Sequence, residues 1–287
     1  MSTAASTSRK PFKFSVSFAA YGLALAWMLS RRPGRSRAGT WAAHTVAVTG
    51  LIEMSIIVGQ TLRGRRSHFD VETPLDRALF QAMGGTITAL WLATLVIAVV
   101  LFRARLGDRP TTWAIRLGAL LALAGLLVGG LMLLPTPEQQ AQQAAGIVPT
   151  VIGAHSVGIP DGGPSMPLTG WNTTGGDLRV PHFVGMHALQ ALPLFLYGIE
   201  ALARRRARLR DERVRLRLVV TAAGFLGGLL ALVTWQALRG QALLRPDAPT
   251  LTALAVLASA TAAGALAALR APRTDRPRPV PAPEPIA

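Results

Sequence analysis

The chain has 287 residues, of which 51% are hydrophobic and only 15% are charged, well below the ~25% charged residues of a typical soluble domain. The formal net charge of +16 comes mostly from arginines in short joints between long apolar runs. Such arginines indicate membrane orientation and contact with anionic headgroups, so nucleic-acid binding is not expected. The chain contains no cysteine, which excludes disulfides, thiolate nucleophiles, covalently attached haem and iron–sulfur clusters.

Seven apolar segments each have about the 20 residues that a helix needs to cross ~30 Å of hydrocarbon. Because lipid offers no partners for backbone N–H and C=O groups, each segment is expected to be helical. The predicted fold is all-α: a polytopic transmembrane bundle of about seven helices over residues 1–270, with one long extracytoplasmic loop. The predicted spans lie near residues 14–30, 41–62, 78–102, 113–134, 181–203, 218–238 and 250–269.

The two ends of the chain differ in character. The basic N-terminus leads into the first apolar run, which no small-residue cleavage site follows, so the sequence predicts a retained anchor. The segment 271–287 is rich in proline and is predicted to be a disordered tail.

The segment 135–180 is the longest stretch without an apolar span. Residues 136–145 are expected to form a short helix that Thr136 caps and Gly146 ends. Beyond it, proline and glycine recur too often for a helix or a long strand, while apolar residues such as Trp171 favour packing. The sequence therefore predicts a lid that folds over the outer mouth of the bundle.

Lysine and arginine are divided unequally between the two sets of joints. The joints 31–40, 103–116 and 204–217, together with the C-terminal tail and Arg270, hold 20 of the 30 basic residues. The positive-inside rule places this set in the cytoplasm. We therefore expect a multi-pass protein of a bacterial inner membrane with a cytoplasmic C-terminus and an extracytoplasmic 135–180 segment.

Ionisable groups inside a span are costly and suggest function. Glu53 lies near the middle of the second span and, at about 100° per residue, shares one sector of the helix with Thr49, Gln60 and Arg63. This stripe is expected to face protein or water, either as a hydrogen-bonded carboxyl that ties two helices together or as a proton or ion site. Gln236 and Arg239 place two further polar groups at the outer end of the sixth span.

Four of the five histidines are expected at the outer face, namely His68, His155, His182 and His187, together with Asp161, Asp177 and Gln190. Three interpretations stay open: an ordered cap with hydrogen-bonded histidines, a metal or haem site, or a substrate path for a transporter. The spacing of five between His182 and His187 is poor for a metal pair on a helix. No second histidine inside another span matches the depth of His187, so the sequence identifies no metal ligands, cofactor or catalytic residues.

Several phrases occur together: KPFKF at 10–14, SHFDVETPLD at 67–76, GAHSVGIPDGGP at 153–164, GWNTTGGDLRVPHFVGMHALQ at 170–190 and TWQALRGQ at 234–241. With these phrases the chain resembles an uncharacterised family of polytopic bacterial membrane proteins, mostly from high-GC genomes. The resemblance covers nearly all of residues 10–250. It implies the membrane architecture and brings no catalytic residues.

Three functions are therefore compatible with the sequence. The first is a metal, haem or small-ligand site in an outward-facing, histidine-rich pocket, with or without enzymatic chemistry. The second is a small-solute or proton-coupled transporter that uses Glu53. The third is a structural membrane subunit whose protein partners the sequence does not identify. In each case the expected environment is the lipid bilayer.

Overall fold

The computed structural model describes residues 3–271, and seven helices in that part of the chain are long and apolar enough to span a membrane. The prediction of an all-α membrane bundle is thereby confirmed. The helices are α1 (Thr3–Ser30), α2 (Arg37–Leu62), α3 (Pro74–Phe102), α4 (Arg109–Leu131), α6 (Arg179–Ala203), α7 (Glu212–Leu238) and α8 (Ala248–Arg270). The predicted tail, 271–287, lies outside the described residues apart from Ala271.

Polar caps explain why several helices begin earlier than their apolar runs. Ser36, Thr73, Asp108, Asp211 and Asp247 each precede a helix and accept a backbone N–H in its first turn. Proline follows at the first or second position of α3, α4 and α8, where its missing N–H has no helical partner to lose. The apolar runs therefore mark the membrane core of each helix and not its ends.

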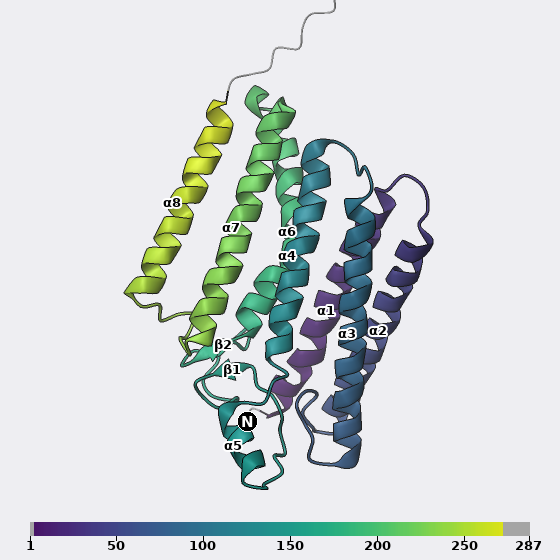
Figure 1. Cartoon of the computed structure of the whole chain (residues 1–287), viewed down its shortest axis with the longest axis vertical. Coiled ribbons are helices and arrows are strands. Elements are labelled where there is room, and N and C mark those ends of the chain that lie inside the picture. The colour runs from purple at the N-terminus through teal and green to yellow at the C-terminus, as the bar shows by residue number, and fades with distance from the viewer. Residues whose placement is uncertain (1–2, 272–287) are drawn as a thin grey trace, which may run out of the picture.

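The helices run up and down the bundle, so their connections fall at two opposite ends (Figure 1). We call the end formed by residues 63–73, 132–178 and 239–247 the loop face. The opposite end, formed by residues 31–36, 103–108 and 204–211, is the arginine face. The short helix η1 (Ala207–Arg210) lies in the arginine face.

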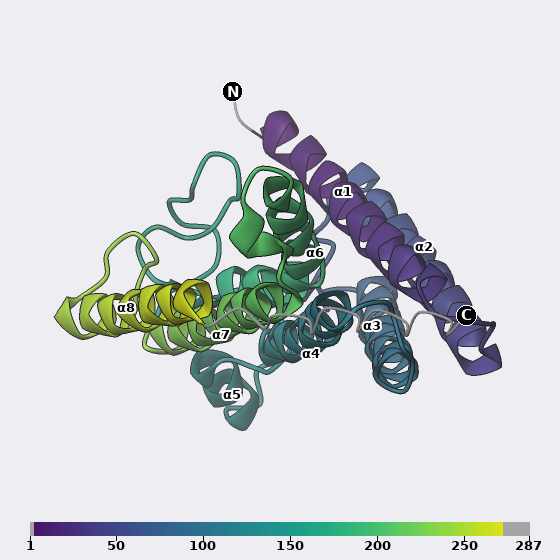
Figure 2. The same ribbon diagram turned by 90° about the horizontal axis from the view of Figure 1, so that it is seen from above.

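The bundle consists of two groups of helices that meet along a seam (Figure 2). In one group α2 packs against α3 and α1; in the other, α4 packs extensively against α6 and α7, and α8 packs chiefly against α7. Contacts between α3 and α4 and between α1 and α6 join the groups. Side chains from both groups, including Met28, Ile97 and Ile115, form the largest core cluster.

The segment 132–178 crosses the loop face and contacts elements of both groups. It contains α5 (Pro137–Ala144), where Thr136 and Gln139 form a capping box, and a small antiparallel pair of β1 (Ser156–Val157) with β2 (Gly176–Asp177). The N–H of Val71 donates to Thr150 O at 3.0 Å, and Lys13 Nζ donates to Thr169 O at 3.0 Å. The predicted short helix is present, whereas the extracytoplasmic position of the segment stays a prediction.

Candidate functional site

Glu53 is buried between α2 and α3, with only 3% of its surface exposed. It lies nine residues before the end of α2, about 13 Å along the axis at roughly 1.5 Å per residue. Its carboxylate accepts a short hydrogen bond from the hydroxyl of Thr86 on α3. Within the described part of the chain, no cationic side chain forms an ion pair with Glu53.

The hydroxyl of Thr86 has more acceptors than it has protons. Thr86 Oγ1 contacts Glu53 and also lies 3.0 Å from each of the carbonyl oxygens of Ala82 and Met83. With its single proton, it can donate a hydrogen bond to an ionised Glu53, or donate to its own helix and accept a hydrogen bond from a neutral Glu53. The pair can therefore accommodate either protonation state without moving a helix.

A second polar cluster closes the α2–α3 interface at the loop face. Asp76, whose side chain is fully buried, accepts from Arg63 Nη1 at 2.8 Å, Gln60 Nε2 at 3.0 Å and Thr73 Oγ1 at 2.6 Å. Gln60 is also buried, whereas the side chain of Arg63 is 37% exposed. In the predicted polar stripe of α2, Thr49, Glu53 and Gln60 are therefore buried, whereas Arg63 lies partly exposed at the end of the helix.

A third polar group lies in the seam between α1 and α6. Ser17 Oγ is 3.3 Å from His187 Nε2, and Gln190 lies one turn further along α6. The Gln190 amide is beside the His187 ring, but both of its polar atoms are buried and make no hydrogen bond of normal geometry within the described residues. A buried amide without such bonds is costly, so a water or a ligand polar group could satisfy it here.

His68 and His155 lie in the loop face, His182 and His187 lie on α6, and each pair contacts one phenylalanine ring. Phe69 lies edge-on to His68 and His155, with centroid distances of 6.0 and 4.8 Å. Phe183 lies 5.6 Å from His182 and 5.7 Å from His187. Each phenylalanine ring thus contacts two imidazoles and contributes an apolar surface beside them.

This arrangement does not fit a metal site. Residues 3–271 include no group of three or more His, Cys, Asp or Glu side chains that could hold a metal ion. His182 Nδ1 instead lies 2.9 Å from the carbonyl of Gly125, which requires the proton on Nδ1. The predicted pocket stays a prediction, and the donor geometry gives no support to its metal version.

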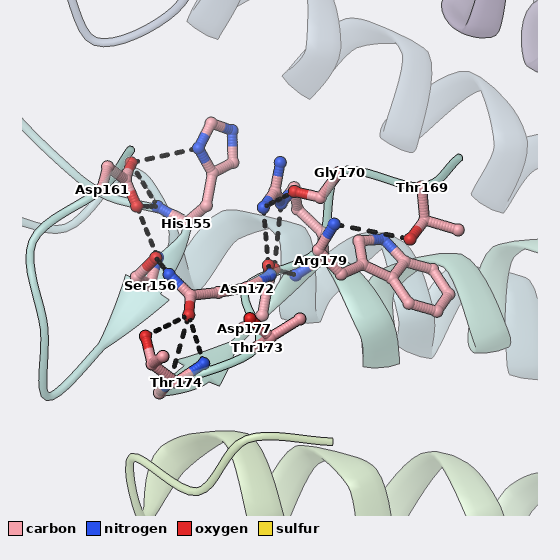
Figure 3. A network of polar contacts seen from close by, with 12 residues as sticks. His155, Ser156, Asp161, Thr169, Gly170, Asn172, Thr173, Thr174, Asp177 and Arg179 are labelled. Atoms are coloured by element: carbon pink, nitrogen blue, oxygen red, sulfur yellow. Dashed lines mark hydrogen bonds and ion pairs between the residues drawn. The ribbon is translucent and has the colours of Figure 1, made fainter. Parts of the chain in front are cut away.

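Asp161 organises one half of the 132–178 segment (Figure 3). Its carboxylate accepts from the backbone N–H groups of His155 at 3.0 Å and Ser156 at 2.8 Å, and His155 Nδ1 lies 3.1 Å away. Burial opposes ionisation of Asp161, but these hydrogen bonds outweigh it and hold the pKa of the carboxyl below its usual range. Asp161 therefore stabilises the turn that leads into β1.

Asp177 organises the other half together with Asn172 and Arg179 (Figure 3). Arg179 binds Asp177 through Nη2 at 2.6 Å and Nε at 2.9 Å, and also donates to Gly170 O at 2.7 Å. Asn172 Oδ1 accepts from Thr174 N and Gly175 N, while its own N–H donates to Asp177 Oδ2 at 2.7 Å. These groups satisfy one another, which is the pattern of a structural network.

Gln236 and Arg239 hold the turn between α7 and α8. Gln236 Nε2 donates to Ala242 O at 3.1 Å. Arg239 forms an ion pair with Asp247 and stacks over Trp235, with its guanidinium carbon 4.4 Å from the ring centroid. Both residues lie at the C-terminal end of α7, where they stabilise the turn that leads to α8.

Sequence reasoning missed several partners of the predicted residues. Asp76 follows Thr73 by three positions at the start of a helix, which reads as an ordinary capping pattern. Ser17 and Thr86 are single hydroxyls inside apolar runs, so their sequence context does not distinguish them. Only the packing of α1 against α6 and of α2 against α3 brings them to His187 and Glu53.

In comparisons with known proteins, no family model, no curated protein and no solved structure matches the chain.

Proposed function

We propose that this integral membrane protein is a proton-coupled transporter of a small polar solute, with Glu53 as the proton-binding residue. The observation that carries the proposal is a carboxyl buried within a span whose partner among residues 3–271 is a neutral hydroxyl and not a cation. Carboxyls that only tie helices together need no capacity to change charge, whereas Thr86 can serve Glu53 in both protonation states.

The polar residues at the seam between the two helix groups also support a role in transport. Three polar groups lie inside the membrane where the two groups of helices meet: the hydroxyl of Ser17, the imidazole of His187 and the amide of Gln190, which has no hydrogen bond of normal geometry to the described residues. Transporter sites commonly lie near the bilayer midplane between such groups. We place the solute at this seam and the proton at Glu53, and α1, which contacts both α2 and α6, is the element that links them.

The proposed function includes an orientation of the bundle in the membrane. The arginine face lies in the cytoplasm of a bacterial cell, and the loop face, with the 132–178 segment, lies outside. The cluster of Gln60, Arg63, Thr73 and Asp76 then closes the outer end of the α2–α3 interface, on the side of Glu53 from which external protons would enter.

The test is proton exchange at Glu53. Infrared difference spectra of the full chain in lipid, recorded between acidic and alkaline buffer, should contain a protonated-carboxyl band that disappears in Glu53→Gln. In proteoliposomes loaded with a pH-sensitive dye, a panel of amino acids and sugars should contain a compound that acidifies the lumen with the wild-type protein. Glu53→Gln should abolish that signal.

Glu72→Gln is the matched control, because Glu72 is an exposed carboxylate of the loop face that pairs with Arg65. It should keep both the infrared band and the lumen signal. A carboxyl band that persists unchanged in Glu53→Gln would contradict proton binding at this residue. Solute uptake that is equally fast in Glu53→Gln would contradict its role in transport.

A further inference from the structure

A recess of ≈ 470 Å³ opens at the arginine face, between the end of α1 and the start of α2. The polar part of its lining consists of two guanidinium groups, three hydroxyls and one imidazole. These belong to Arg32, Arg35, Ser30, Ser36, Thr40 and His44. The remaining lining residues, such as Leu29 and Ala43, are apolar or glycine.

The recess contains positive charge without an anion. None of its lining residues is acidic, and within the described residues neither Arg32 nor Arg35 forms an ion pair. Arg32 is oriented by a hydrogen bond of 3.0 Å from Nη1 to Gly34 O. The nearby carboxylates of the arginine face are engaged on the other helix group, where Asp108 pairs with Arg215 and Glu212 accepts from Arg109 N.

The level of the recess in the bilayer is indicated by two tryptophans. Trp27 precedes it on α1 and Trp41 lies beside it on α2, and both are exposed, at 42% and 73%. Exposed tryptophans at the ends of spans mark the interface between hydrocarbon and headgroups. The recess therefore opens at the depth where phospholipid phosphates lie, with apolar helix surface on its membrane side.

We propose that this recess binds the phosphate of an anionic phospholipid headgroup. Two guanidinium groups can hold phosphate oxygens through paired N–H donors, and Ser36, Thr40 and His44 supply further donors, whereas the Ser30 hydroxyl already donates to Trp27 O. The same chemistry would suit free phosphate, but the position beside exposed apolar helix surface favours a phosphate that carries acyl chains. The recess does not include Glu53, so its lipid binding can be tested independently of transport.

The test uses the full chain in nanodiscs that contain phosphatidylglycerol and phosphatidylcholine, followed by native mass spectrometry. The wild-type protein should retain one phosphatidylglycerol in preference to phosphatidylcholine. Arg32→Gln/Arg35→Gln should weaken this retention about tenfold or more, because each arginine near a charged headgroup contributes substantially to binding. Arg32→Lys/Arg35→Lys should retain an intermediate amount, since lysine keeps the charge but loses the paired donors.

The matched control is Arg205→Gln/Arg206→Gln, which removes two exposed arginines from the same face outside the recess. It should retain phosphatidylglycerol as the wild-type protein does, and thermal unfolding should show that both double variants are folded. Equal loss of lipid in both glutamine variants, or equal retention in both, would overturn a specific site. Inorganic phosphate that binds in pure phosphatidylcholine nanodiscs with the same dependence on Arg32 and Arg35, without lipid selectivity, would overturn the assignment to a headgroup.

Discussion

Single residues in this protein are distinguished by what surrounds their polar atoms. Asp161, Asp177 and Asp76 have nearly every carboxylate oxygen matched by N–H or O–H donors, so they hold backbone and helix ends in place. Glu53 and Gln190 lie in apolar surroundings with few partners. Because a buried polar group with few partners is costly, these two residues are the ones on which the proposed function rests.

Asp161 gives a prediction on pH and stability. Its folded pKa is lower than its unfolded value of about 3.8, so its contribution is present above about pH 4 to 5 and is lost as the pH falls toward the folded pKa. Asp161→Asn should therefore lower the free energy of unfolding by roughly 1–3 kcal/mol near pH 7. Thermal unfolding of wild type and variant in detergent should show a difference that shrinks below about pH 4. A difference that stays constant with pH would contradict the assignment.

At the scale of the element, the backbones of α4 and α6 approach each other closely at two glycines. A Cβ added at Gly125 would lie 2.6 Å from Gly185 Cα, and one added at Gly185 would meet Gly125 in the same way. The neighbouring Gly129 faces the His182 ring. Inside a bilayer the hydrophobic effect does not drive helices together, because apolar side chains are already out of water. Close backbone contact instead holds the helices together through dispersion attraction.

Gly125→Ala should therefore destabilise the bundle, by roughly 1–3 kcal/mol, because the backbone of α6 must move to admit the methyl group. Gly224→Ala is the matched control: a Cβ at Gly224 would meet nothing within 4 Å. Thermal unfolding in detergent should separate the two, with Gly224→Ala close to wild type. Equal destabilisation by both substitutions would show that loss of glycine itself, and not helix contact, is responsible.

At the scale of the whole molecule, the even alternation of seven spans puts the arginine-rich joints together at one end. The other end holds the 132–178 segment, which contacts residues from both helix groups. The positive-inside rule predicts that the arginine face lies in the cytoplasm.

The absence of cysteine makes this orientation directly measurable. Single cysteines at Leu168, which is 85% exposed in the loop face, and at Arg205 in the arginine face should react differently with a membrane-impermeant maleimide. We expect Leu168→Cys to be labelled in intact spheroplasts and Arg205→Cys only after permeabilisation. Leu254→Cys, on the lipid-exposed side of α8, should stay unlabelled in both conditions. The reverse labelling of the first two would invert the proposed orientation.

The sequence by itself determined the membrane class, the seven helices, the cap of α5 and the placement of Glu53 and Gln60 on a face of α2 that turns away from lipid. These follow from properties local to a helix: the length of an apolar run, the chemistry of its first turn and the period of its polar stripe. The sequence also predicted that four histidines share one face. It could not decide that Phe69 contacts His155 or that Ser17 contacts His187, because these residues are brought together only by the tertiary fold.

The tertiary structure alone decided that Thr86 faces Glu53, that Ser17 faces His187 and that a recess without acidic residues opens between α1 and α2. Each of these depends on the rotation and depth of one helix against another. In lipid, those quantities are set by close packing at positions such as Gly125 and Gly185, and the sequence does not indicate which helix each glycine will face.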